Sequence, residues 1–103
     1  MEMVRLKCGI IHSRAFADFL REKHAAEIDD HFGKILCLDY IRASEGESAG
    51  SAWWHLSWIS EFSAPIEHRH DIGGTEVFIH RQTRNGLKNH LLHYANGQVV
   101  VKR

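Results

Sequence analysis

Two Asn-Gly pairs, Asn85-Gly86 and Asn96-Gly97, constrain the fold of this chain more than any other feature. An Asn-Gly pair between two apolar segments is the strongest short-range signal for a tight β-hairpin, because both residues readily adopt the positive φ angles of a two-residue turn. The pairs lie eleven residues apart. They therefore predict three consecutive antiparallel strands with a defined register.

This register sorts the side chains of the three strands into two faces, because directly paired residues share a face. One face is apolar and contains the rows Val77–Tyr94–Val99 and Ile79–Leu92–Val101. The opposite face mixes apolar and polar side chains, namely Phe78, His80, Leu91, His93, Val100 and Lys102. A slip of one residue would scatter the apolar rows over both faces.

The remaining segments predict a helix and further strands. Ser13 is a suitable N-cap, and apolar residues recur at helical spacing over residues 14–32, before Gly33. Strands are expected over residues 4–11, 35–42 and 52–60, and the segment 63–74 is interpreted as a long connecting loop. We therefore expect a single α+β domain over residues 1–103, with one main helix packed on a meandering antiparallel sheet of about five strands.

Composition narrows the functional classes. The 103 residues carry no net charge, and no apolar run is long enough for a membrane helix. The N-terminal residues lack the pattern of a signal peptide, so a cytoplasmic location without membrane association is expected. Residues 65–103 carry six basic and three acidic side chains and five of the nine histidines, which is only a mild basic excess. The two cysteines, Cys8 and Cys37, are expected to be free thiols; a disulfide or a shared metal is the alternative.

The first functional hypothesis is a binding or regulatory protein that acts through the mixed face of the sheet. A partly apolar open face with aromatic side chains is typical of an interface. A protein partner or self-association as a homodimer is expected, and no cofactor is needed. The candidate binding residues are Trp53, Phe78, Asn89 and Leu91.

The second hypothesis is a small ribonuclease that needs no metal. His80 and His93 are diagonal neighbours in the predicted register, and two imidazoles can serve as acid and base on one phosphate of RNA. Lys102 would stabilise the developing negative charge. His55, which Asp39 would orient, completes the candidate catalytic set.

The third hypothesis is metal binding by the segment 63–74. His68, His70 and Asp71 offer three ligands within four residues. Alternate histidines on an extended segment point the same way, which suits zinc or another divalent metal. Arg69, between the histidines, opposes a cation.

Overall fold

The computed structural model describes residues 2–42 and 52–102, without the side chains of residues 40–42 and 52–55. Within these ranges the strands are β1 (Met3–Arg5), β2 (Ile11–Ser13), β3 (Lys34–Arg42), β4 (Ala52–Ser60), β5 (Arg69–Ile72), β6 (Thr75–Ile79), β7 (Leu91–Ala95) and β8 (Gln98–Lys102). The α-helices are α1 (Arg14–Glu27) and α2 (Arg81–Leu87), and three short 3₁₀ helices are η1 (Ile28–Asp30), η3 (Glu61–Ser63) and η4 (Ile66–His68). None of the helices in these ranges is both long and apolar enough to cross a membrane.

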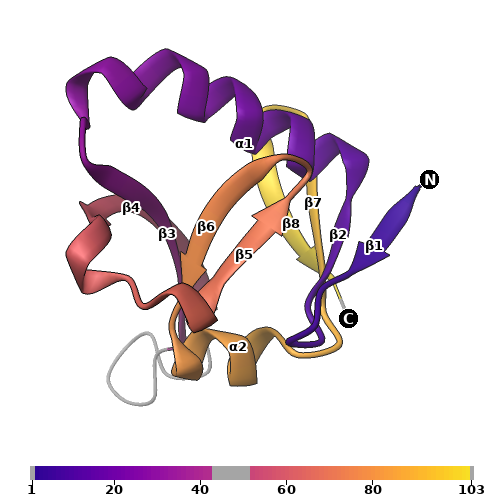
Figure 1. Ribbon diagram of the computed structural model, residues 1–103. Coiled ribbons are helices and arrows are strands. Elements are labelled where there is room, and N and C mark those ends of the chain that lie inside the picture. Colours follow the sequence, from indigo (N-terminus) through magenta and orange to yellow (C-terminus); the bar gives the residue numbers. More distant parts are fainter. Residues whose placement is uncertain (1, 43–51, 103) are drawn as a thin grey trace.

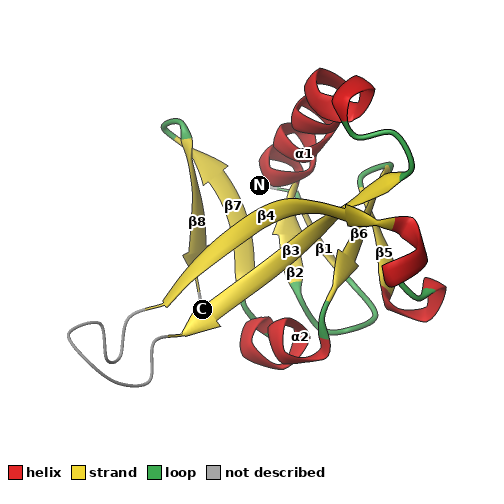
Figure 2. Cartoon of the chain, turned by 90° about the vertical axis from the view of Figure 1, so that its left-hand side faces the viewer, coloured by secondary structure: helices red, strands yellow, loops and turns green. Residues whose placement is uncertain are grey.

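The strands form two four-stranded sheets, with the orders β1-β2-β7-β8 and β4-β3-β6-β5. Each sheet is mixed, because β2 runs parallel to β7 and β3 runs parallel to β6. Helix α1 lies along one end of the strands and α2 lies at the other end (Figures 1 and 2). The α+β class is thus confirmed, whereas the expected architecture of one helix on one antiparallel sheet of about five strands is wrong.

The main core lies between the two sheets and is closed by both helices. Its buried members include Phe16 and Leu20 from α1, Leu36 and Leu38 from β3, and Leu87 from α2. The two predicted apolar rows also contribute, since Val77, Ile79, Leu92 and Val99 are buried in this cluster, with Tyr94 and Val101 packed against it. The rows therefore share an interior, although they belong to different sheets.

Helix α1 begins as predicted. The Ser13 side chain accepts a hydrogen bond from the Phe16 backbone N–H at 3.2 Å, as an N-cap does. The helix ends at Glu27, whose carboxylate accepts hydrogen bonds from Lys23 and from the Trp58 indole, both at 2.8 Å. These two bonds lower the pKa of Glu27. The predicted extension to residue 32 is wrong, because a 3₁₀ turn follows and Phe32 is 94% exposed.

The two Asn-Gly pairs have different structures. Asn96 and Gly97 have φ angles of 55° and 79° and join β7 to β8 in the predicted register, with Tyr94 opposite Val99. Asn85 and Gly86 instead lie in α2, so the first predicted hairpin is wrong. Strand β6 does not pair with β7.

Two further expectations required correction. The strand predicted over residues 4–11 is split into β1 and β2, because the chain reverses between them. The segment 63–74 is not one long loop: it contains η4 and β5, and β5 pairs with β6 at the edge of its sheet. The predicted strands over 35–42 and 52–60 are confirmed as β3 and β4, which form an antiparallel pair.

Candidate functional site

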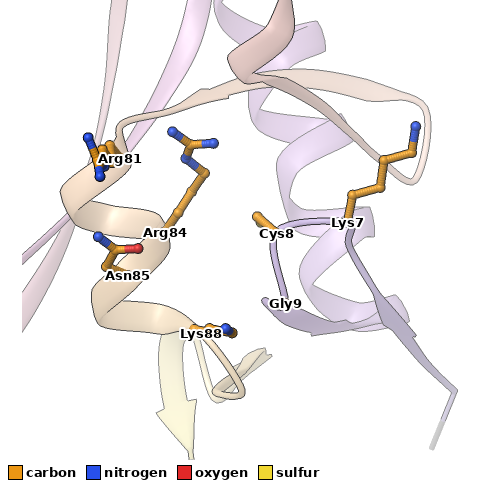
Figure 3. A pocket seen from close by; sticks show the side chains of 7 residues that line it. All are labelled: Lys7, Cys8, Gly9, Arg81, Arg84, Asn85 and Lys88. Carbon is orange, nitrogen blue, oxygen red and sulfur yellow. The ribbon is translucent and has the colours of Figure 1, made fainter.

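A cavity of about 310 Å³ lies between α2 and the turn that joins β1 to β2. We call it the basic pocket. Helix α2 and the residue after it contribute one wall, and the turn contributes the other (Figure 3). The lining residues are Lys7, Cys8, Gly9, Arg81, Arg84, Asn85 and Lys88.

Helical spacing explains why the cations of α2 lie together. Arg81 and Arg84 are three residues apart, so they lie on one side of the helix, and Lys88 follows directly after its last residue. Thr83 and Leu87 are four residues apart and buried, and they face the protein interior. The amphipathic pattern of α2 therefore keeps Arg81 and Arg84 out of the core, and all three cations line the pocket.

Backbone hydrogen bonds hold the turn against the end of α2. The Gly9 N–H donates to the Leu6 carbonyl at 2.9 Å, and the Asn89 N–H donates to the Gly9 carbonyl at 2.9 Å. Gly9 has a φ of 94°, and a Cβ placed there would lie 2.9 Å from Cγ of Lys88. Glycine is thus required at this position both for its backbone conformation and for the close approach of Lys88.

The cations of the basic pocket have no acidic partner within salt-bridge distance in the described part of the chain. None of Lys7, Arg81, Arg84 and Lys88 forms a salt bridge within residues 2–42 and 52–102. Arg84 Nε is one of four buried side-chain nitrogens without a hydrogen-bond partner among the described residues; the others belong to His31, His68 and His70. A buried donor without a partner is costly in a folded protein, so an anion that accepted a hydrogen bond from this nitrogen would remove that cost.

A second cavity of about 350 Å³ shares Lys7 with the basic pocket. It is lined by Arg5, Leu6, Lys7, Arg69, His70 and Asp71. Arg5 and Arg69 are occupied by hydrogen bonds to protein oxygens. Burial lowers the pKa of His70, and the positive charges of Arg84, His68 and Lys7 lower it further. The positive field of the basic pocket therefore extends to this cavity.

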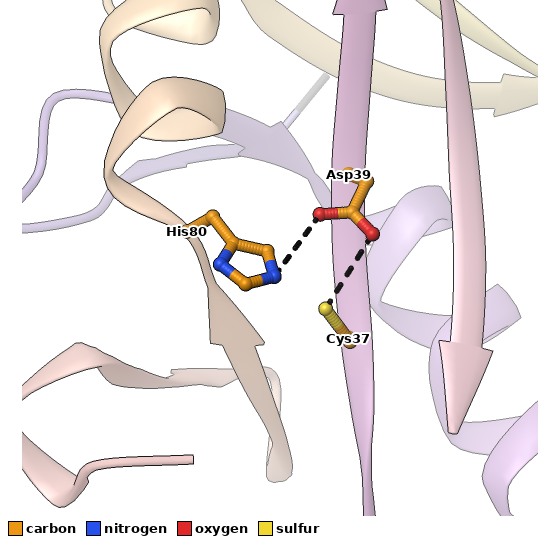
Figure 4. A group of neighbouring side chains, drawn as sticks. All are labelled: Cys37, Asp39 and His80. Carbon is orange, nitrogen blue, oxygen red and sulfur yellow. Dashed lines mark hydrogen bonds and ion pairs between the residues drawn. The ribbon is translucent and has the colours of Figure 1, made fainter. Parts of the chain in front are cut away.

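A separate cluster joins Cys37 and Asp39 of β3 to His80, which follows β6 (Figure 4). Residues two apart on a strand share a face, and the parallel register places Leu38 opposite Ile79, so His80 comes next to Asp39. The Cys37 thiol donates to Asp39 Oδ2 at 3.7 Å, and His80 Nε2 lies 3.5 Å from Asp39 Oδ1. Burial raises the pKa of Cys37 to about 12, and the charge of Asp39 adds to this effect.

The structure does not assemble the predicted ribonuclease site. His80 and His93 lie with different sheets, because β6 and β7 do not pair. The His93 ring is hydrogen-bonded to Ser13 Oγ at 2.7 Å and thereby supports the cap of α1. Lys102 is exposed near the end of β8. The backbone of His55 lies opposite that of Asp39, as the strand pattern suggested, but its side chain is outside the described residues.

The predicted binding face is also dispersed. Phe78 is 4% exposed and belongs to a small second core with Ile35, Cys37 and Ala64. Leu91 is half-buried in the other sheet. Asn89 is exposed and lies in the turn after α2, where it has a φ of 66°. Its side-chain oxygen accepts a hydrogen bond from Arg5. The side chain of Trp53 is not among those described.

The predicted metal ligands do not form a three-ligand group. The His68 ring contacts Phe78, His70 lines the second cavity, and Asp71 accepts a hydrogen bond from the Gly74 N–H at 2.6 Å. In the described part of the chain, the one group of three ligand atoms within 4.8 Å of one another is that of Cys37, Asp39 and His80.

The basic pocket was missed in the sequence, although its signal is visible there. Arg81, Arg84 and Lys88 have the spacing of one helix face, but the interpretation of Asn85-Gly86 as a hairpin turn concealed it. Comparisons with family models, curated proteins and solved structures found no match. The function is therefore inferred from the side chains and their geometry.

Proposed function

We propose that this chain is a binding protein for a phosphate-bearing anion, which it holds in the basic pocket. The observation that carries the proposal is a set of four cations around one cavity. Among the residues that the structure describes, these cations form no salt bridge and the buried Nε of Arg84 has no hydrogen-bond partner. Arginine and lysine side chains are the groups that recognise phosphate oxygens, and arginine does so with paired hydrogen bonds.

The size of the pocket favours a phosphate group over a large apolar ligand. A volume of about 310 Å³ is at the lower end of small-molecule sites. The lining includes no aromatic side chain, so stacking of a nucleobase is not the source of affinity within the pocket itself. The adjoining second cavity offers space for the rest of a longer ligand.

This proposal retains the binding function inferred from the sequence but moves it from the sheet face to the pocket between α2 and the β1–β2 turn. Self-association and capture of a protein partner stay predictions, because they depended on a face that the structure divides between two sheets. A ribonuclease function has lost the His80–His93 pairing on which it depended.

The test is calorimetric titration of the full chain with two probes, inorganic pyrophosphate and a short oligothymidylate, at low ionic strength. Arg81→Gln and Lys88→Gln should each weaken binding of both probes. Arg21→Gln is the matched control, because Arg21 is exposed on α1 and already paired with Asp18 at 2.7 Å. Equal binding by all variants, or no binding of either probe, would show that the basic residues are only solvated surface.

Salt dependence separates a short ligand from an extended one. Each phosphate neutralised on a single strand contributes about −0.7 to the slope of log K against log salt, so four contacts give a slope of about −3. A slope near this value for oligothymidylate, with weaker binding of pyrophosphate, would favour a nucleic-acid strand. Tighter binding of pyrophosphate would favour a small phosphorylated molecule.

A further inference from the structure

The cluster of Cys37, Asp39 and His80 has the geometry of a metal centre. Its three potential ligand atoms lie within 4.8 Å of one another. Tetrahedral zinc, with bonds of about 2.0–2.3 Å, places neighbouring ligand atoms roughly 3.3–3.8 Å apart. Cys37 Sγ lies 3.7 Å from Asp39 Oδ2, and His80 Nε2 lies 3.5 Å from Asp39 Oδ1, so both neighbours of the carboxylate are near this spacing, each from a different oxygen. A small shift of the side chains brings one Asp39 oxygen to both.

We propose that Cys37, Asp39 and His80 bind a zinc ion. One sulfur, one oxygen and one nitrogen form a donor set that suits zinc, whereas magnesium and calcium prefer oxygen ligands alone. The three ligands come from adjacent parallel strands of one sheet, β3 and the end of β6, so their backbones are held in place before a metal arrives. The site shares no residue with the basic pocket, although His80 directly precedes Arg81 at the start of α2.

The three side chains differ in exposure, and the difference leaves a path by which a metal ion can enter. Cys37 is buried at 1% exposure, whereas the Asp39 and His80 side chains are 28% and 53% exposed. An ion can thus approach from the His80 side and reach the thiol last. Three protein ligands leave the fourth tetrahedral position for water, an arrangement found at reactive zinc sites.

Binding of zinc would release one proton from Cys37. Zinc binds the thiolate, so the Cys37 S–H bond breaks, a Zn–S bond forms and one proton passes to the buffer. No electron is transferred. The hydrogen bond from the thiol to Asp39 is lost, and the carboxylate oxygen that accepted it becomes available to the metal.

The experiment is titration of the full chain with Co²⁺ and then Zn²⁺, in a Cys8→Ser background so that Cys37 is the single thiol. Cobalt should produce the thiolate charge-transfer band and the intense visible absorption of a tetrahedral site, and zinc should abolish both in a 1:1 ratio. Zinc should raise the melting temperature, and a chelator should reverse the shift. Mg²⁺ should have no effect.

Single substitutions locate the site. His80→Gln and Asp39→Asn should weaken cobalt binding at least tenfold, a ligand loss that preserves side-chain size. Cys37→Ser should abolish the charge-transfer band. His24→Gln is the matched control, since His24 lies on α1 beside Trp58 and should leave the titration unchanged.

The proposal is overturned if the cobalt spectrum lacks the charge-transfer band, or if His80→Gln and Asp39→Asn bind zinc as tightly as the unmodified chain. Either result would leave the three residues as a hydrogen-bonded chain only. His80 is half-exposed, so its substitution tests the site even if the buried Cys37→Ser variant fails to fold. Pyrophosphate titration of the same variants keeps failure of this proposal distinguishable from failure of the anion proposal.

Discussion

Replacement of Arg84 by methionine should stabilise the free protein and weaken ligand binding at the same time. The Nε of Arg84 is buried without a partner, while three further cations line the same cavity. Methionine has a similar length and carries no donor. The substitution therefore removes both an unsatisfied group and like-charge repulsion, and it preserves most of the packing of the side-chain stem.

The magnitudes follow from the two roles of this side chain. A buried unpaired donor costs about 1–3 kcal/mol. Arg84 as a whole is only partly buried, which favours the lower end, so we expect the free energy of unfolding to rise by about 1 kcal/mol. Loss of charge-assisted hydrogen bonds to a phosphate costs about 1.5–3 kcal/mol, which corresponds to roughly 10–150-fold in Kd. Stability and affinity should thus change in opposite directions.

Urea denaturation followed by tryptophan fluorescence measures the first quantity, and calorimetric titration with pyrophosphate measures the second. Arg21→Met is the control, because the exposed Arg21–Asp18 pair contributes at most about 0.5 kcal/mol and lies on another helix. A loss of stability in Arg84→Met would mean that Arg84 supports the fold. Unchanged affinity would mean that Arg84 does not contact the ligand, and either result refutes the reasoning.

Three further predictions concern the fold and its pH dependence. Gly86→Ala in the exposed part of α2 should stabilise the protein by up to about 1 kcal/mol. Gly97→Ala, at a φ of 79°, should destabilise it by about 1 kcal/mol. If thermal denaturation shows that both substitutions change the stability in the same direction, the assignment of Gly86 to a helix and of Gly97 to a turn is contradicted. His93→Ala should lower the free energy of unfolding by about 1 kcal/mol through loss of the bond to Ser13, and a urea titration that matches the unmodified chain would refute this structural role. The pKa of His70 is lowered in the folded state, so the stability that this residue contributes is present above pH of about 6.5 and is lost as the pH falls through the folded pKa. His70→Gln should therefore reduce the decline of the unfolding free energy between pH 7 and pH 5. If the slope of the unfolding free energy against pH is unaltered, His70 is not in the partly buried environment near cations that the structure shows.

Local signals explain the parts of the fold that the sequence predicted correctly. Ser13 caps α1 with its own side chain, and Asn96-Gly97 forms a turn between strands that follow each other directly. Strands β3 and β4 were recognised from apolar alternation within each segment. In each case the deciding interaction lies within a few residues or within one continuous apolar run.

Parallel pairing explains the main error. Strand β6 pairs with β3, which lies more than thirty residues earlier in the sequence. The local sequence pattern of β6 does not identify so distant a partner. The burial of Val77 and Ile79 was nevertheless anticipated, because alternation reveals which face is apolar without revealing what covers it. Asp39 and His80 meet for the same reason, because β3 and β6 are neighbours in the sheet.

The error in the fold and the missed site have a common cause. If Asn85-Gly86 formed a hairpin turn, Arg81 and Arg84 would lie on the strand before it. Their side chains would then point to opposite faces, because residues an odd number of positions apart on a strand lie on opposite faces. In a helix the same two residues share a side, and Asn85 and Lys88 join them in the pocket lining. Asn85-Gly86 enters the last turn of α2 because Thr83 and Leu87 are spaced to be buried together beneath it. Burial of these two side chains thus gathers the cations, and any change that returns residues 81–87 to an extended conformation should abolish anion binding along with the helix.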